Sequence, residues 1–164
     1  MMTLDEAIIQ QKRNLDSLWI ARTAVPARLA ADLPPVNGRP VKVWRVPASQ
    51  LPLINGSRAN GTVMRRGDTY VIFISDNPKL SLLNMPSLSG EWLDRYLVLH
   101  ELGHILNGDV FEDDPARIYQ RYSLPFDWQP IEEGADAWAC KLLVEEARAA
   151  SEASVSEEVG RFAV

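Results

Sequence analysis

The sequence predicts an α+β fold in which a few β-prone runs lie between amphipathic helices. Apolar residues recur every three or four positions near the start of the chain and again after residue 90, which is the spacing of helices that bury one face. Between these stretches, residues 41–46, 61–65 and 69–74 are rich in β-branched and aromatic side chains, which favour strands. A chain of 164 residues is long enough for one hydrophobic core, so we expect a single domain over 1–164.

The composition is that of an ordinary globular protein and argues against several classes of function. The net charge is −5, and no basic cluster is longer than Arg65-Arg66, so we expect no direct binding to nucleic acid. The single cysteine, Cys140, excludes an internal disulfide framework and is typical of a reducing compartment. The first residues carry acids rather than the apolar core of an export signal, and no run approaches the length of a membrane span. We therefore expect a cytoplasmic protein without a membrane partner.

The N-terminal segment, 1–35, is expected to be helical. Thr3 followed by Glu6 is the pattern of a capping box, which marks a helix start. Mostly apolar residues then recur at alternating steps of four and three, which predicts one amphipathic helix ending near Val25-Pro26 and a short helical piece over 27–33 after it. We expect the first helix to pack on the sheet, although a helix of this kind could also bind a partner.

Three strands are predicted between the helices. The first, 41–46, lies between prolines. The runs 61–65 and 69–74 are separated by Arg66-Gly67-Asp68, which favours a hairpin. The run 69–74 is apolar on both faces and is expected to be the more central strand. The run 61–65 is more polar and is expected at the edge of the sheet, where it could pair with an extended peptide.

The next helix is expected to begin at a cap provided by Ser87 or Ser89 and to end at Asn107-Gly108. It is apolar nearly all round, so it should be buried between other elements. Gly103 lies in its interior, where glycine costs about 1 kcal/mol relative to alanine. A close approach of a neighbouring backbone is the expected reason for a glycine at that position.

This helix carries the chain's only two histidines, in the pattern His100-Glu101-Leu102-Gly103-His104. Residues four apart lie on nearly the same helix face, so both imidazoles can bind one divalent metal ion, typically zinc. Glu101 projects about a quarter turn away and can accept a proton from a water molecule at the metal. The alternatives are histidines that merely pack in a core, or a closed structural zinc site. A structural site usually needs thiolates, and Cys140 is the only cysteine.

A catalytic zinc site needs a third protein ligand. The extended motif with a third histidine is excluded, because Asn107 and Val110 stand where its glycine and histidine would be. A carboxylate must therefore complete the site. The connection that follows the motif offers four acidic residues that could reach it: Asp109, Asp113, Asp114 and Asp127.

Glu132 is the preferred third ligand because it opens the last strong helix, which is expected over 131–150. Asp136 follows one turn later and could accept the second ring N–H of His100, which would fix the tautomer of that imidazole. Glu133 is the rival ligand, one position round the helix. A simpler alternative is that both glutamates only place favourable charge at a helix N-terminus.

Two further segments are without a firm structural prediction. The connection 109–130 is long enough to be a functional lid or to hold structure of its own. The polar tail, 151–164, could be frayed helix or disordered chain. The connection also offers four side chains that could stabilise negative charge developing on a substrate oxygen: Arg117, Tyr119, Arg121 and Tyr122.

The histidine motif and the later glutamate together resemble the ImmA/IrrE family of metallopeptidases. The family patterns H-E-L-G-H and E-x-x-A-N-x-F-A-x-x-L-L are similar to His100–His104 and to the run that begins at Glu132. Arg95-Tyr96 also resembles an arginine-aromatic pair that precedes the motif, and the resemblance covers residues 41–144. The chain departs from the family pattern, without losing a ligand, at Leu97, Leu99, Asp136 (in place of asparagine) and Val144-Glu145.

The resemblance implies a compact zincin fold with a catalytic core over 41–148. A small, mostly antiparallel sheet would pack on the helix that carries the histidines, with the glutamate helix beside it. Relatives in this family cleave helix-turn-helix repressors, so the implied function is a zinc endopeptidase that cuts such a repressor. The alternative is a non-cleaving module that binds a repressor or an antitoxin-type partner and uses its metal for shape. The implied site has one zinc ion per chain bound by His100, His104 and Glu132, with Glu101 as general base and Asp136 behind a ligand histidine.

Overall fold

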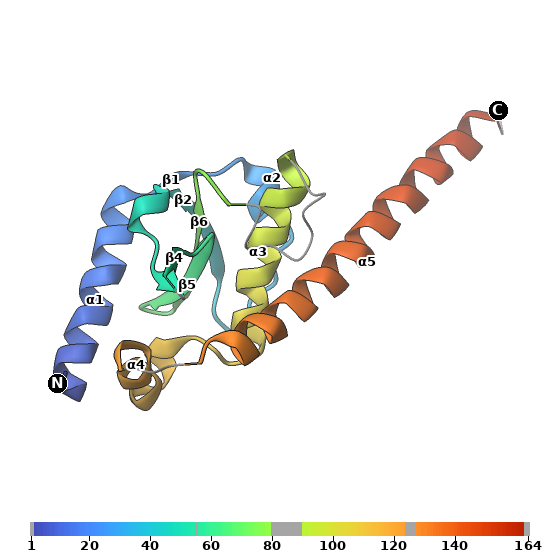
Figure 1. Cartoon of the computed structure of the whole chain (residues 1–164). Coiled ribbons are helices and arrows are strands. Elements are labelled where there is room, and N and C mark those ends of the chain that lie inside the picture. The colour runs from blue at the N-terminus through green and yellow to red at the C-terminus, as the bar shows by residue number, and fades with distance from the viewer. Residues whose placement is uncertain (1, 55, 80–89, 124–126, 163–164) are drawn as a thin grey trace.

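A mixed four-stranded sheet lies between one helix on one face and two packed helices on the other (Figure 1). The structure is a computed structural model and describes residues 2–54, 56–79, 90–123 and 127–162. The helix α1 (Leu4–Ala21) covers one face of the sheet. On the other face α3 (Gly90–Leu106) packs on the strands, and α5 (Gln129–Phe162) packs on α3. The α+β fold expected from the sequence is confirmed.

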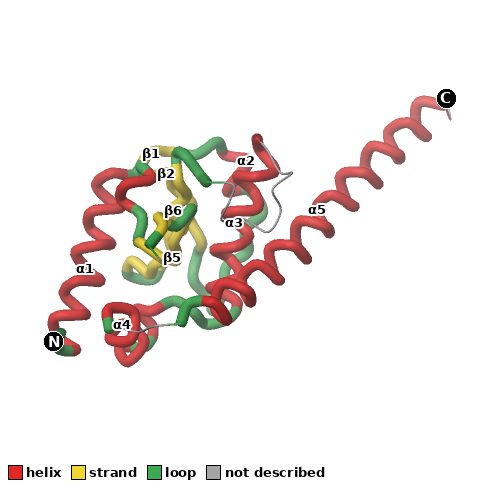
Figure 2. Tube along the Cα trace, in the orientation of Figure 1, coloured by secondary structure: helices red, strands yellow, loops and turns green. Residues whose placement is uncertain are grey.

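The strand order in the sheet is β1-β2-β6-β5 (Figure 2). The edge strands are β1 (Thr23–Ala24) and β5 (Gly61–Arg66), and the central strands are β2 (Val41–Val46) and β6 (Thr69–Ser75). The two outer pairings are antiparallel, whereas β2 and β6 are parallel. The sheet is thus mostly antiparallel, as expected. The predicted hairpin of β5 and β6, the central place of β6 and the edge position of β5 are also confirmed.

The parallel pairing follows from the path of the chain between β2 and β5. After β2 the chain forms a 3-10 turn, η1 (Ala48–Gln50), and a small hairpin of β3 (Leu53–Ile54) and β4 (Ser57–Arg58). It then continues along β5 at the edge, and the turn after β5 places β6 between β5 and β2. The sequence predicts only a turn-rich segment here, so the small hairpin is an addition that the structure supplies.

Both faces of β6 are buried, which joins the two halves of the core. Tyr70, Ile72 and Ile74 belong to the core shared with α3, whereas Val71 and Phe73 belong to the core shared with α1. None of these side chains is more than 2% exposed. Because successive side chains of a strand point to opposite faces, a strand between two helical layers requires an uninterrupted apolar run.

The first helix begins at the predicted capping box. The Thr3 hydroxyl accepts the backbone N–H of Glu6, and the Glu6 carboxylate accepts the backbone N–H of Thr3, each at 3.2 Å. Leu15 and Leu18 then bury one face of α1 against the sheet. The expectation that this helix packs on the sheet is therefore confirmed.

The end of α1 differs from the prediction. The helix stops at Ala21 rather than near Val25-Pro26, because residues 23–24 instead pair with β2 as the short strand β1. The following helix, α2 (Ala27–Ala30), is shorter than the predicted piece over 27–33. Tertiary strand pairing has overridden the helical pattern of the sequence at this point.

The helix α3 is buried on most sides, as its composition predicts. The proposed caps, Ser87 and Ser89, lie outside the described residues. Its C-terminal end is as predicted, since Leu106 is the last helical residue and Gly108 has a φ of +73°. That left-handed conformation is the common end of a helix, and glycine adopts it without strain.

Gly103 allows α5 to approach α3 closely, which is the reason expected for a glycine there. A Cβ atom added to Gly103 would lie 2.8 Å from the carbonyl oxygen of Ala135 and 3.0 Å from Cβ of Trp138. Both atoms belong to α5, and the first is backbone that cannot swing aside. The crossing of the two helices at Gly103 therefore sets how near their side chains come.

We expect Gly103→Ala to destabilise the fold. Alanine recovers about 1 kcal/mol of helix propensity, but overpacking a tight contact costs about 1–3 kcal/mol, so the net effect should be a loss of about 1 kcal/mol. Denaturant unfolding measures it. Gly134→Ala is the matched control, because its added Cβ would meet only the movable side chain of Asn107 at 3.0 Å. A Gly103 variant as stable as the Gly134 variant would show that the helix contact can relax.

The connection after α3 holds structure of its own, which was one of the two expectations for it. It contains the 3-10 turn η3 (Phe111–Asp113) and the helix α4 (Pro115–Tyr122), and α4 packs against α1. The segment leads from the end of α3 to the start of α5, and Asp109, Phe111, Arg121 and Trp128 of this segment line a hollow with His104.

The last helix runs beyond its predicted end at residue 150. It continues to Phe162, so the segment expected to be frayed or disordered is helical over 151–162. Arg95 of α3 holds Glu146 through donor–acceptor distances of 2.6–3.1 Å, and beyond that point α5 extends away from the rest of the chain (Figure 1). Among the helices of the described residues, none combines the length and the apolar character needed to cross a bilayer.

Candidate metal centre

Two histidines of α3 and one glutamate of α5 meet where these helices cross. Nε2 of His100 lies 2.9 Å from one carboxylate oxygen of Glu132, and Nε2 of His104 lies 3.3 Å from the other. The centroids of the two imidazole rings are 4.9 Å apart, and the rings are nearly perpendicular. The four-residue spacing thus places both rings on one face of α3, and Glu132, in the first turn of α5, faces them.

The outer nitrogen of each imidazole contacts a carboxylate of its own. Nδ1 of His100 lies 2.7 Å from Oδ1 of Asp136, the contact predicted from the sequence. Nδ1 of His104 lies 3.2 Å from Oδ2 of Asp109, which is buried. Asp109 had been a candidate for the third ligand, and the structure places it behind a histidine instead. With both Nδ1 atoms held this way, both Nε2 atoms face the same point.

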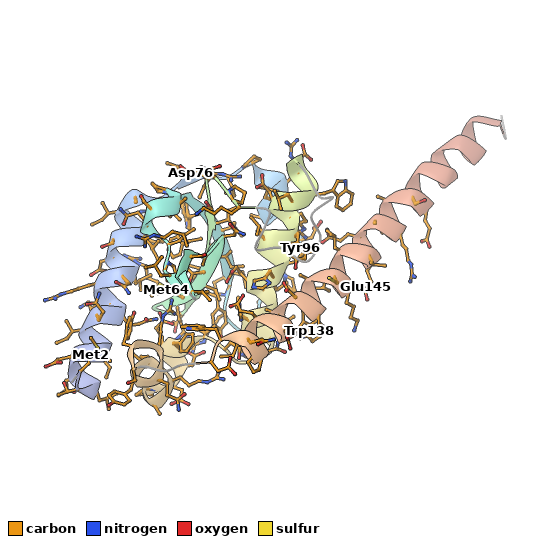
Figure 3. All side chains as sticks on the ribbon, in the orientation of Figure 1. Met2, Met64, Asp76, Tyr96, Trp138 and Glu145 are labelled. Atoms are coloured by element: carbon orange, nitrogen blue, oxygen red, sulfur yellow. The ribbon has the colours of Figure 1, made fainter. Side chains whose placement is uncertain are left out.

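Tyr96 adds a further contact that the sequence analysis missed. Its hydroxyl donates to the same oxygen of Asp136 that contacts His100, at 2.5 Å, and its side chain is fully buried. Burial and the neighbouring Asp136 raise the pKa of Tyr96 well above its usual value, so it remains a donor. Figure 3 labels Tyr96 on α3 and Trp138 on α5, the two helices that carry the site. The sequence does contain a signal for this contact, because Tyr96 lies four residues before His100 and therefore on the same face of the helix.

We expect Tyr96→Phe to weaken metal binding while the fold persists. The change leaves the Asp136 carboxylate with one donor fewer, so it holds His100 less firmly. Direct partners of a metal-binding histidine contribute about 10–100-fold to affinity, so a group one step further out should contribute about 3–10-fold. Competition with a chelating dye measures this for zinc. Tyr70→Phe, which removes another buried hydroxyl whose partners are Asp113 and Asn37 rather than Asp136, is the control. Equal affinity in the two variants would assign Tyr96 to packing alone.

Glu101 is buried beside the histidines and touches the edge of the sheet. The residue Glu101 is only 4% exposed to solvent. A Cβ atom added to Gly61, the first residue of β5, would lie 3.0 Å from Oε1 of Glu101 and 3.0 Å from the carbonyl oxygen of Phe73. Burial raises the pKa of Glu101, and the charges of His104 and His100 oppose that rise. A side chain added at Gly61 would therefore force this carboxylate or the strand to shift.

Two hollows reach the site, and Gly61 lines both of them. The larger, of about 340 Å³, is lined by His100, Glu101 and Glu132 together with residues of β4 and the start of β5. The smaller, of about 30 Å³, is lined by His104, the same two glutamates and side chains of the connection 109–130, Arg121 among them. The inner faces of the histidines and of Glu101 are therefore accessible to a small group, although these residues are largely buried.

The three central side chains form a tight arrangement of opposite charges. Burial lowers the pKa of both histidines, but their carboxylate partners outweigh it: Asp136 and Glu132 raise the pKa of His100 to about 10, and Asp109 and Glu132 raise the pKa of His104 to about 9. Burial raises the pKa of Glu132, but hydrogen bonds from both imidazoles hold it well below its usual range. In the metal-free chain the positive charge of this cluster comes from two protonated imidazoles. A divalent cation would supply the same charge once both imidazoles lose their protons.

His100, Glu101 and His104 form a group that could hold a metal ion. One ligand atom of each lies within 4.8 Å of the others. Imidazole nitrogen and carboxylate oxygen are donors that zinc and similar divalent ions accept, and neither imidazole uses its Nδ1 for anything but a carboxylate. Cys140 packs against the core and is not part of this group. The residues present thus fit one divalent ion between the helices.

The other candidate third ligands have different partners. Glu133 is the acceptor for the side-chain amide of Gln129 on the exposed side of α5. The loop acids are occupied as follows: Asp113 pairs with Arg65 and accepts from Tyr70, Asp114 caps α4 at Ala116, and Asp127 accepts the backbone N–H of Gln129. Among the residues that the structure describes, Glu132 is the carboxylate that contacts both Nε2 atoms.

The structure also distinguishes among the four candidates for stabilising negative charge on a substrate oxygen. Arg117 donates to the carbonyl of Gly108 and contacts Asp109. Tyr122 bonds with Asn14 and Gln11 of α1, and Tyr119 packs in the same interface. Arg121 is the candidate that lines the small hollow with Glu101 and His104.

Metal binding is expected to release about two protons at pH 7. Since the pKa values of His100 and His104 in the metal-free protein lie above 7, both imidazoles hold a proton there, and a metal ligand must be neutral. Apparent affinity should therefore rise with pH up to about 10, the pKa of His100, which is the higher of the two. Calorimetric zinc titrations in buffers of different ionisation enthalpy count the protons. Binding that is independent of buffer and pH would mean that the histidines are already neutral.

Comparison of this chain with protein-family models, with curated proteins and with solved structures finds no match.

Proposed function

We propose that the protein is a zinc-dependent endopeptidase that cleaves a specific protein partner. The observation that carries the proposal is the buried carboxylate of Glu101, which lies beside two imidazoles whose outer nitrogens are tied to Asp136 and Asp109. A purely structural metal site has no use for a free acid at an accessible hollow, and burying an unused carboxylate is costly. An acid in that place is what metal-assisted hydrolysis requires.

Each residue of the centre has a role in this proposal. His100, His104 and Glu132 hold the zinc ion, and Asp136 and Asp109 orient the two imidazoles. The bound ion supplies the Lewis-acid chemistry that makes peptide hydrolysis possible at neutral pH. Glu101 accepts a proton at its carboxylate from the attacking water and passes it to the leaving amine. Its raised pKa suits this work, because a base whose pKa approaches the working pH can both take and give the proton.

The edge of the sheet supports a protein substrate. β5 is an edge strand that begins at Gly61, directly against Glu101, and Gly61 lines both hollows. An extended segment could add to such an edge through backbone hydrogen bonds, which would bring a peptide bond to Glu101. Arg121 lines the small hollow with Glu101 and His104, so its positive charge lies where the bound substrate would pass.

The proposed partner is a helix-turn-helix repressor in the cytoplasm, by the resemblance to the ImmA/IrrE family alone. The test is incubation of the zinc-loaded chain with the repressor encoded beside its gene. Two discrete fragments, absent when a chelator is added, support an endopeptidase. A stable complex that yields no fragments would instead support the non-cleaving module, because both functions include metal and only one includes hydrolysis.

A further inference from the structure

A groove of about 300 Å³ adjoins the small hollow of the metal centre. It lies between the β3–β4 hairpin, β5 and the facing residues of α1 and α4. It shares Pro52, Thr62, Arg121 and Trp128 with the hollow that touches Glu101 and His104. The two spaces are thus neighbours along the edge of the sheet, and a chain lying on β5 at Gly61 would pass from one into the other.

The charge of this groove is opposite to that of the protein. The chain has 22 acidic and 17 basic side chains, yet the groove is lined by two arginines, Arg58 and Arg121, and by no aspartate or glutamate. Other arginines of the chain have carboxylate partners, as Arg45 has in Asp94 at 3.1 Å and Arg95 in Glu146 at 2.6 Å, although the half-buried Arg22 stacks on Trp19 instead. Of the two groove arginines, Arg121 is half-buried and Arg58 is exposed.

Neither arginine of the groove has an ion-pair partner within the part of the chain that the structure describes. Arg58 donates to the carbonyl oxygen of Leu51, another wall residue, at 2.8 Å. The guanidinium of Arg121 lies over the rings of Phe111 and Trp128, 4.9 and 5.6 Å from their centroids. Stacking on the two rings holds Arg121 in place and leaves its N–H groups available at the ring edges.

We infer that this groove binds a carboxylate side chain of the substrate, so that the cleaved segment carries aspartate or glutamate close to the scissile bond. The inference rests on the proposed endopeptidase function and adds its specificity. The planar guanidinium group matches a carboxylate with two parallel hydrogen bonds, so Arg58 and Arg121 can select an acid over its amide. Leu51, Met64 and Trp128 form the apolar part of the wall, and the half-buried Arg121 is screened less by solvent than a fully exposed charge would be.

A structural role for Arg121 is the competing explanation. Burial raises the pKa of Glu112, and the charge of Arg121 is one of the influences that oppose it. However, Glu112 accepts a hydrogen bond from Gln11 at 2.8 Å and does not line the groove. Arg58 does not contact Glu112; it lines both the groove and the larger hollow of the metal centre, so it tests the substrate-facing charge independently of the interaction between Arg121 and Glu112.

The first experiment measures cleavage by the zinc-loaded full chain in a proteome-derived peptide library. We expect aspartate or glutamate to be enriched on one side of the cut. Arg58→Gln and Arg121→Gln should each reduce that enrichment by about tenfold, as expected for losing a hydrogen-bonded charge pair. Arg13→Gln, an exposed residue of α1 with the same change in charge, should leave it unaltered. Cleavage with no acidic preference, or equal loss for acidic and neutral sites in both groove variants, would overturn the inference.

A second measurement does not depend on hydrolysis. A fluorescein-labelled Gly-Glu-Glu-Gly peptide is titrated with the zinc-loaded chain, and Gly-Gln-Gln-Gly serves as its neutral counterpart. We expect the acidic peptide to bind more tightly, and the preference to fall about tenfold in Arg58→Gln but not in Arg13→Gln. If the acidic peptide binds more tightly but no peptide of the library is cleaved, the groove binds carboxylates and the proposed endopeptidase function is wrong. If the library is cleaved but both peptides bind equally, the endopeptidase function is supported and the inference about the groove is wrong.

Discussion

Glu101→Gln is expected to keep the metal and to abolish cleavage of the partner. The amide has nearly the same shape as the carboxylate, so the fit against Gly61 survives, but it cannot accept a proton from the attacking water. A general base contributes about 10²–10⁴-fold to a rate, so the variant should keep about one per cent of activity or less. Fragment yield on a gel gives the activity, and elemental analysis of the purified chain gives the metal content.

Glu91→Gln is the matched control for this experiment. It makes the same chemical change in the same helix, at an exposed residue that pairs with Arg28. Its activity and metal content should equal those of the natural chain. If Glu101→Gln still cleaves at the natural rate, proton transfer belongs to another group and the proposed mechanism is wrong. If it loses metal as well, Glu101 is itself a ligand, as its place in the group with His100 and His104 allows.

Glu132→Gln is expected to remove the metal. The carboxylate contacts both imidazoles, and its negative charge is the main compensation for the cation between them. Groups that only orient a ligand contribute about 10–100-fold to affinity, so loss of a charged ligand should exceed about 100-fold. The variant should therefore purify without zinc and show no cleavage at micromolar zinc. Zinc competition and elemental analysis measure the effect.

Glu133→Gln separates this prediction from a general effect of charge at the start of α5. Glu133 lies one position further round the helix and accepts from Gln129, away from the histidines. It carries the same charge at nearly the same distance from the helix end, so any benefit to the helix dipole is shared by both residues. Metal loss in Glu133→Gln with retention in Glu132→Gln would reverse the ligand assignment.

The parts of the site that the sequence predicts are those set by helical spacing. His100 and His104 share a face because they are four residues apart, and Glu132 and Asp136 share a face for the same reason. Once the two helices pack, the two pairs meet, and the contact of Asp136 with His100 follows. The glycine at the crossing was also predictable, because glycine in a buried helix interior needs a steric reason.

The parts that the sequence could not predict depend on how the connections fold. Asp109 follows His104 by five residues, but it reaches Nδ1 only because the chain turns back after the left-handed Gly108. Residues 23–24 left the helical pattern because a strand partner, β2, was available at that point. The two arginines of the groove come from β4 and α4, more than sixty positions apart, and no periodicity relates them.

The close fit of Gly61 against Glu101 has a consequence for where the chemistry is anchored. The acid is attached to α3, but it rests on the first residue of β5, whose place is fixed by its pairing with Ile74 in β6. The alignment of the proposed reacting group therefore depends on strand registry as much as on the helix. A slip that moved Thr62 into the place of Gly61 would press its side chain against the Glu101 carboxylate. An error in strand pairing would therefore displace the proposed base from the peptide bond that it acts on.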